Sequence, residues 1–154
     1  PVGLKDPLKI IEFSLKGHFS NFKNNLKENC TGDWIFQIDA DELPTYYLIK
    51  NIKEVLKYNP TIELFLVPRV NTVEGLTQEH INKWRWNVNG WVNWPDYQTR
   101  IIQNSPKIKW QNRVHEQIVG ASTKTALPMQ EEWCLYHPKT IERQEIQNNF
   151  YDTL

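Results

Sequence analysis

One stretch of the chain, DWIFQIDADELP at residues 33–44, limits the possible folds more than any other. It joins an apolar run of β-branched and aromatic residues to three carboxylates, Asp39, Asp41 and Glu42. Such a run is typical of a buried strand. Carboxylates crowded at the end of a strand repel one another unless a cation or hydrogen-bond donors compensate them. A solvated loop that caps the next helix is the simpler interpretation, since Asp is a good N-cap residue.

The rest of the sequence predicts one mixed-sheet α/β domain over residues 1–154, because strand and helix patterns alternate early and short strands dominate late. Ligands of such sheets bind beyond the carboxyl ends of strands, where Asp39 and Asp41 lie. Two carboxylates at i and i+2 can flank a hard divalent cation. Strands are predicted at residues 8–15, 33–38 (as a central strand), 62–70, 98–103, 107–110, 114–119 and 131–137. Helices are predicted at residues 21–30, 45–58, 77–84 and 140–154, with Ser20 and Thr140 as caps.

The composition excludes several classes of protein. Lys plus Arg equals Asp plus Glu at 18 each, which argues against a nucleic-acid partner, since such proteins need a basic surplus. No apolar run reaches the roughly 18 residues of a membrane span. The two cysteines are far apart and lack CxxC spacing, so neither a disulfide scaffold nor a zinc site is indicated. With no secretory signal at the start, we expect a reducing, cytoplasmic setting.

The segment around the three acids resembles a known enzyme family. NNLKENCTGDWIFQIDADE is similar to the part of family 2 glycosyltransferases, which have the GT-A fold, that leads into their DxD motif, with Lys23-Asn24 in place of a basic-Asn pair. VPRVNTVEG, WVNWPDYQTRII, WQNRVHEQIVG and LYHP resemble later landmarks of one branch of that family, in the same order. The similarity begins at about Phe13. The chain has no counterpart of the family's N-terminal base-binding segment. We therefore expect either a catalytic domain that is partial at its N-terminus or a nucleotide base that is held by other residues.

The resemblance implies inverting transfer of a sugar from a nucleoside-diphosphate donor, with a UDP-sugar preferred, to a hydroxyl of a glycan or glycoconjugate. A divalent cation, Mn²⁺ or Mg²⁺, would neutralise the leaving diphosphate. Asp41 is the first choice as metal ligand, and Asp39 is expected at the metal, its water or the ribose. His137 stands where GT-A enzymes often place a late metal or phosphate ligand. Further donor contacts are expected from Lys23, Asn24 and His115.

Direct displacement also needs a base, and the candidates are Glu116 and Asp96. A carboxylate can serve if it is partly desolvated, which raises its pKa toward the working pH. Glu116 is preferred because it ends a strand-like run near the expected pocket; the alternative is a surface carboxylate paired with Arg113. Asp96 has the alternatives of a chain turn or a pair with Arg100. Arg100 and Arg113 are expected to bind phosphate through paired N–H donors of the guanidinium group. The alternative is that they neutralise Asp96 and Glu116.

Five tryptophans cluster in the second half of the chain, and two of them are expected to stack on a sugar, although tryptophans most often fill cores. They are Trp84, Trp86, Trp91, Trp94 and Trp110, and we favour Trp86, Trp91 and Trp94. Two other functions stay open. A carbohydrate-binding module would use the tryptophans beside an incidental acidic loop. A haloacid-dehalogenase-like phosphatase also has DxD after a strand, but such an enzyme is expected to have Thr or Val two places after the second Asp, where this chain has Leu43.

Overall fold

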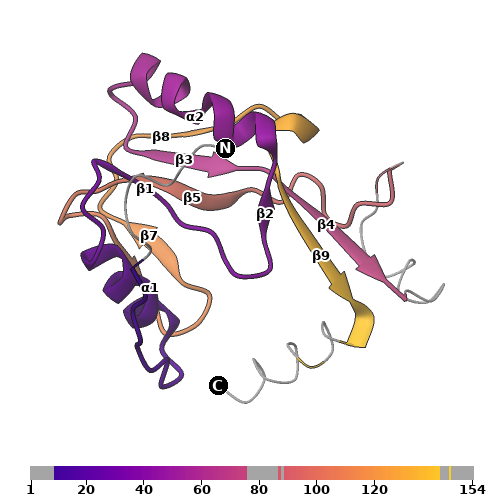
Figure 1. Cartoon of the computed structure of the whole chain (residues 1–154), viewed down its shortest axis with the longest axis horizontal. Coiled ribbons are helices and arrows are strands. Elements are labelled where there is room, and N and C mark those ends of the chain that lie inside the picture. The colour runs from indigo at the N-terminus through magenta and orange to yellow at the C-terminus, as the bar shows by residue number, and fades with distance from the viewer. Residues whose placement is uncertain (1–8, 76–86, 88, 143–145, 147–154) are drawn as a thin grey trace.

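The protein is described here by a computed structural model, which covers residues 9–75, 87, 89–142 and 146 (Figure 1). Within these residues, a four-stranded sheet has the order β1 (Trp34–Phe36), β5 (Gln98–Gln103), β3 (Leu64–Val67) and β8 (Lys124–Ala126). A three-stranded sheet has the order β2 (Leu43–Pro44), β9 (Leu135–Thr140) and β4 (Arg69–Glu74), and β6 (Lys109–Gln111) pairs with β7 (Gln117–Val119). Parallel and antiparallel pairs occur in both larger sheets, which confirms the predicted mixed-sheet α/β class.

The two larger sheets share one continuous segment of chain. The sequence predicts a single strand at residues 62–70, but Pro68 divides it into β3 and β4. Proline has no N–H to give to a ladder, whereas its carbonyl still accepts from the backbone N–H of Leu135 at 2.9 Å. The chain therefore leaves one sheet and enters the other at Pro68, which places Arg69 at the start of β4, next to the crossing point.

Helix α2 (Tyr46–Tyr58) covers one face of the four-stranded sheet (Figure 1). The helix forms as predicted because its apolar residues recur at helical spacing, and Thr45 caps it by accepting from the backbone N–H of Leu48 at 3.2 Å. Leu48 is fully buried against Phe65, Val67 and Ile101. Full burial of a side chain of this size contributes about 1.5–3 kcal/mol. This core holds the sheet on which the pocket described below is built.

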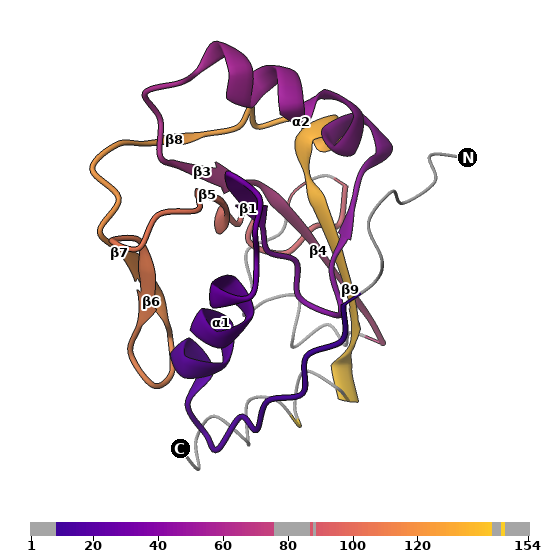
Figure 2. The same cartoon turned by 60° about the vertical axis from the view of Figure 1, so that its left-hand side comes forward.

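Helix α1 (Phe19–Glu28) lies beside the β6–β7 hairpin (Figure 2). Its N-cap is His18, whose Nδ1 accepts from the backbone N–H of Asn21 at 3.4 Å. The prediction that Ser20 caps this helix was therefore wrong. Asn24 fastens the helix to the hairpin, since its side chain accepts from the backbone N–H of Trp110 at 2.8 Å and donates to the same residue's carbonyl at 2.9 Å.

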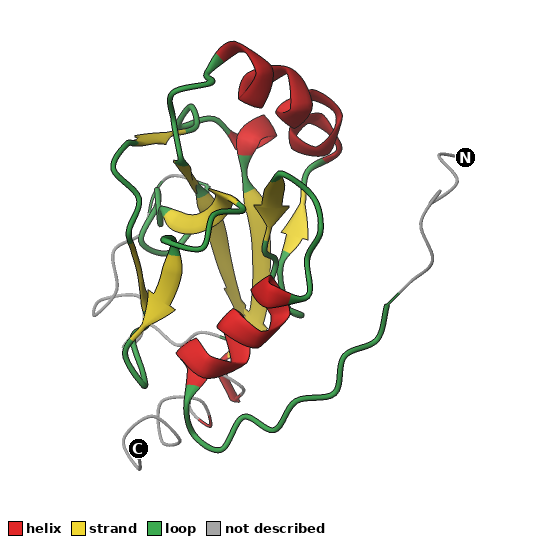
Figure 3. Cartoon of the chain, turned by 90° about the vertical axis from the view of Figure 1, so that its left-hand side faces the viewer, coloured by secondary structure: helices red, strands yellow, loops and turns green. Residues whose placement is uncertain are grey.

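Several other predicted elements differ from the structure. Residues 9–15, predicted as part of a strand, run as an irregular extended segment that leads into α1 (Figure 3). Strand β1 is shorter than predicted and lies at the edge of the described sheet. A 3₁₀ turn at Glu131–Trp133 precedes β9, which ends at Thr140, and Ile141 and Glu142 directly after it are helical. The helix predicted at 77–84 and most of the one at 140–154 lie outside the described residues. No helix in the described part of the chain is long and apolar enough to cross a membrane.

Candidate functional site

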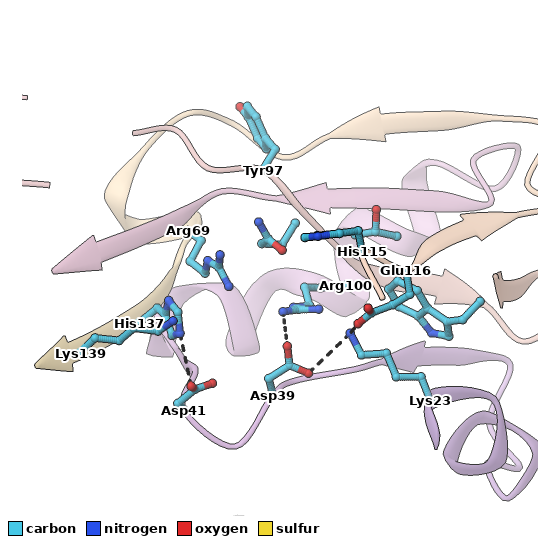
Figure 4. Close-up of a pocket in the computed structure, with 13 residues that line it drawn as sticks. Lys23, Asp39, Asp41, Arg69, Tyr97, Arg100, His115, Glu116, His137 and Lys139 are labelled. Atoms are coloured by element: carbon cyan, nitrogen blue, oxygen red, sulfur yellow. Dashed lines mark hydrogen bonds and ion pairs between the residues drawn. The ribbon is translucent and has the colours of Figure 1, made fainter. Parts of the chain in front are cut away.

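A pocket of about 450 Å³ opens beyond the carboxyl end of β1 (Figure 4). The loop after β1 supplies one wall, and β5 runs antiparallel to β1 so that its first residues reach the same place. The helix and the loop contribute Lys23 of α1 and Asp39 and Asp41 after β1. The larger sheets contribute Arg69 of β4, Tyr97 just before β5, Gln98, Thr99 and Arg100 of β5, and His137 and Lys139 of β9. The hairpin contributes Trp110 of β6 and, just before β7, His115 and Glu116.

The loop that carries the acids is a tight turn held from inside by Glu42. The backbone N–H of Glu42 donates to the carbonyl of Asp39 at 3.0 Å, and Glu42 Oε2 accepts from the backbone N–H of Asp39 at 3.2 Å. The Glu42 side chain is fully buried, and its Oε1 accepts from Arg69 Nη1 at 2.9 Å and from Arg100 Nη2 at 2.6 Å. Arginines thus compensate the crowded carboxylates, and Thr45 caps α2. The alternative of a simple Asp cap was wrong.

Burial by itself would raise the pKa of the Glu42 carboxyl. The hydrogen bond and charge of Arg100, the backbone N–H of Asp39 and the hydrogen bond from Arg69 outweigh burial, so the pKa is lowered. Glu42 is therefore ionised near neutral pH. Arg100 also contacts Asp39, with its Nη2 at 2.6 Å from Asp39 Oδ2, so a single guanidinium joins both ends of the turn.

Asp96, one of the two candidate bases, does not line the pocket. Its Oδ2 accepts from Arg69 Nε at 2.9 Å and Nη2 at 2.6 Å and from Asn71 Nδ2 at 2.8 Å, and its Oδ1 accepts from Gln98 Nε2 at 2.7 Å. Burial alone would raise its pKa, but the charge of Arg69 and these hydrogen bonds lower it. Asp96 is absent from the pocket lining and these partners engage both of its carboxylate oxygens, which favours Glu116 as the base; the role of Asp96 as base stays a prediction. Its predicted pairing with Arg100 is replaced by the pair with Arg69.

Asp41 and His137 face each other at one end of the pocket, with Asp41 Oδ2 at 3.4 Å from His137 Nε2 (Figure 4). The other ring nitrogen, Nδ1, lies 2.8 Å from Asn71 Oδ1. Burial lowers the pKa of His137, and the charges of Arg69 and Lys139 lower it further, more than Asp41 and Glu42 raise it. The imidazole is therefore neutral at pH 7, and its contact with Asp41 is not an ion pair.

The metal ligands predicted from the sequence are only partly brought together. Asp41 and His137 converge, but the Asp39 carboxylate is directed at Arg100 and Lys23 (Figure 4). The residues that the structure describes contain no group of three or more His, Cys, Asp or Glu side chains that could hold a metal ion. Any ion at this end would have Asp41 and His137 as its protein ligands.

Glu116 lies at the other end of the pocket, bound to Lys23. Lys23 Nζ is 2.5 Å from Glu116 Oε1 and 4.0 Å from Asp39 Oδ1, and it stands 4.5 Å above the ring of Trp110. Trp110 is itself anchored, because its Nε1 donates to Gln37 Oε1 at 2.9 Å. Burial would raise the pKa of Glu116, yet the hydrogen bond from Lys23 and further hydrogen bonds and charges lower it. The expectation of a raised pKa for this carboxyl was wrong.

Several predicted site residues lie elsewhere. Asn24 binds the backbone of Trp110, and Arg113 Nε donates to the carbonyl of Gly17 at 2.9 Å on an exposed surface. Neither lines the pocket. Trp91 and Trp94 pack edge to face with their ring centroids 4.9 Å apart and are also absent from the lining. Trp86 lies outside the described residues. The pocket does contain Lys23, Asp39, Asp41, Arg100, His115, Glu116 and His137, as predicted.

The sequence-based prediction missed Arg69, Asn71 and Lys139. A signal for them was present, because side chains two apart on a strand share a face. Arg69 and Asn71 are two apart on β4, and His137 and Lys139 are two apart on β9. Once His137 is suspected as a ligand, its neighbour at i+2 is a natural candidate.

Comparison with models of known protein families finds no match, and comparison with curated proteins finds none either. The chemistry of the pocket therefore has to be inferred from its own residues.

Proposed function

We propose that the chain is a catalytic domain of the GT-A type, which transfers a sugar from a nucleoside-diphosphate donor to an acceptor hydroxyl with inversion. One observation carries the proposal. A carboxylate–imidazole pair suited to a metal, Asp41 with His137, and a second carboxylate suited to act as base, Glu116, stand at opposite ends of one pocket (Figure 4). A displacement with inversion needs its leaving group and its base on opposite sides of the reacting carbon. A diphosphate held at the Asp41 end and a base at the Glu116 end would meet that requirement.

The Asp41 end of the pocket suits the diphosphate. A carboxylate oxygen and an imidazole nitrogen 3.4 Å apart form a mixed donor set for a divalent ion. The carboxylate suits Mn²⁺, and phosphates and water commonly complete the shell of such an ion. A bound divalent ion would act as a Lewis acid that neutralises charge on the leaving diphosphate. Arg69 and Lys139 line the same end and add positive charge there.

Glu116 would take the proton of the acceptor hydroxyl. In the reaction, the acceptor oxygen forms a bond to the anomeric carbon, the bond from that carbon to the diphosphate oxygen breaks, and the proton passes to the Glu116 carboxylate. Its lowered pKa keeps Glu116 ionised near neutral pH and therefore able to accept a proton, although it makes Glu116 a weaker base than a carboxylate of raised pKa. Lys23 holds the carboxylate in place from α1.

The test is release of nucleoside diphosphate from a panel of nucleotide sugars, with UDP-sugars first, in the presence and absence of Mn²⁺. Glu116→Gln should lower turnover by about 10²- to 10⁴-fold, the usual contribution of a general base, with donor binding nearly unchanged. Asp41→Asn should abolish metal-dependent donor binding. Asp33→Asn is the matched control, because it makes the same charge change just before β1 and outside the pocket lining.

Two results would replace this proposal. Metal-independent glycan binding without release of nucleoside diphosphate would indicate a carbohydrate-binding module. Hydrolysis of a simple phosphate ester that depends on Asp39 and Asp41 would indicate a phosphatase.

A further inference from the structure

Three side chains form a continuous chain of hydrogen bonds that starts at the pocket lining and runs from His137 to Asn71 to Asp96. Asn71 Nδ2 lies 2.8 Å from Asp96 Oδ2 and 3.3 Å from the carbonyl oxygen of Val92. An ionised carboxylate and a carbonyl can only accept hydrogen bonds. The amide nitrogen of Asn71 must therefore face these two oxygens, which fixes the amide orientation and directs Oδ1 to His137.

The orientation of Asn71 decides which nitrogen of His137 carries the proton. Asn71 Oδ1 can only accept, and it lies 2.8 Å from His137 Nδ1, so Nδ1 is the protonated nitrogen. In the uncharged ring, the form that binds a metal, this leaves the lone pair on Nε2. This lone pair lies 3.4 Å from Asp41 Oδ2, which is also an acceptor. Two acceptors that face each other repel unless a cation lies between them.

Without Asn71, Asp41 would draw the proton to the opposite nitrogen. The ring would then donate from Nε2 to Asp41, and the lone pair that a metal needs would be lost. The register of the sheet enforces the choice, because Asn71 and His137 are directly paired on the parallel strands β4 and β9. Asp96, held by Arg69 from β4 and Gln98 from β5, keeps Asn71 from turning.

We propose that Asn71, anchored by Asp96, is a positioning residue that holds His137 as the Nδ1–H tautomer, so that Nε2 and Asp41 form a ready ligand pair for a divalent ion. This inference rests on the metal-dependent function proposed above. An imidazole lone pair favours Mn²⁺ over Mg²⁺, which prefers oxygen ligands. Loss of the Asn71 contact should therefore weaken Mn²⁺ binding more than Mg²⁺ binding.

The tautomer can be measured without metal or substrate. Long-range ¹H–¹⁵N correlation spectra of the metal-free protein should show His137 protonated at Nδ1 and unprotonated at Nε2, with the signals assigned by their loss in His137→Gln. Asn71→Leu should move the proton to Nε2. Asn71→Asp should retain the Nδ1–H form, because one oxygen of the new carboxyl still accepts from Nδ1 while the other, protonated, donates to Asp96 in place of the amide nitrogen. An Nε2–H tautomer in the wild-type protein would overturn the inference, whatever the fate of the variants.

Mn²⁺ binding gives the second readout, measured from the electron paramagnetic resonance signal of unbound Mn²⁺. Asn71→Leu should weaken binding by about 10- to 100-fold, as is usual for loss of a residue that orients a metal ligand, and Asn71→Asp should bind nearly as the wild type does. Asn104→Leu is the control for general destabilisation. Its side chain also makes two hydrogen bonds, to the carbonyls of Cys30 and Gly32, and it does not line the pocket.

The results separate this inference from the proposed function. Unchanged Mn²⁺ binding in Asn71→Leu would overturn the inference and leave a metal-dependent transferase intact. Equal losses in Asn71→Leu, Asn71→Asp and Asn104→Leu would also overturn it, since they would reflect stability alone. Mn²⁺ binding that follows the expected order, in a protein that releases no nucleoside diphosphate from any donor, would support the inference and count against the proposed function.

Discussion

Glu42→Gln should destabilise the folded protein by about 3 kcal/mol. The Glu42 side chain is fully buried and accepts from Arg69, Arg100 and the backbone N–H of Asp39. Breaking a buried ion pair by removal of one partner costs about 3–5 kcal/mol. The lower end applies because each arginine keeps another carboxylate, Asp96 for Arg69 and Asp39 for Arg100. Both arginines donate to Oε1, so the glutamine oxygen can still accept from them, but the amide nitrogen then takes the place of Oε2 and meets the backbone N–H of Asp39 as donor against donor.

Urea unfolding followed by the fluorescence of the seven tryptophans measures this change. Glu54→Gln, on the exposed side of α2, is the control and should change stability little. A loss below about 1 kcal/mol in Glu42→Gln would refute the reasoning, because it would mean that the arginines gain little from the carboxylate between them.

The loss of stability caused by Glu42→Gln should also depend on pH. The pKa of Glu42 is lowered from its ordinary value of 4.5 in the folded protein, so its stabilising contribution is complete above that value. The contribution is lost as the pH falls through the folded-state pKa. The difference in stability between wild type and Glu42→Gln should therefore shrink on acidification. A stability difference that stays constant from neutral pH to below the folded-state pKa of Glu42 would contradict the conclusion that the ionised carboxylate is what stabilises the fold.

Three further changes test the pocket and its supports. Lys23→Met should raise the pKa of Glu116, so the rise of turnover with pH should move to higher pH; an unchanged profile would argue against Glu116 as base. Gly120→Ala should cost at least about 2 kcal/mol in urea unfolding, since φ is +87° and the new Cβ would lie 1.8 Å from the backbone oxygen of Lys107. His115 has φ +51°, so His115→Gly should be more stable than His115→Ala by about 1 kcal/mol. Equal urea midpoints for these two variants would show that this backbone conformation is not strained.

Local patterns predicted those elements whose own side chains determine them. Helix α2 was found because Leu48, Ile52 and Val55 repeat at helical spacing, and β5 was found with its correct bounds, 98–103. Strand β8 was missed because Lys124–Ala126 has no apolar signal and exists only through its pairing with β3. Residues 9–15 have an apolar pattern but no partner strand in the described part of the chain. Pairing across the sheet cannot be read from a segment alone.

The residues of the candidate site were likewise predictable only where the local sequence determines their place. The turn with Asp39 and Asp41 was predictable because acids at a strand end are visible in the sequence. The approach of His137 to Asp41 depends on the register of β2 against β9, which pairs Leu43 with Tyr136. Of the tryptophans considered, Trp110 lines the pocket whereas Trp91 and Trp94 do not, because residue type does not distinguish ring packing, as in Trp91 with Trp94, from a pocket wall.

The parallel pairing of β4 and β9 has a consequence for the order of folding. Asn71 and His137 are 66 residues apart in sequence, and Asp39 and Arg100 are 61 apart. Closing such long loops costs entropy that is recovered only when the contacts form, so contacts of this kind form slowly. A chain that has assembled only β3, β5 and α2 has the core of the domain but no ligand pair. An ion that needs both Asp41 and His137 would bind after β9 has docked, and would then stabilise the completed fold against its precursors.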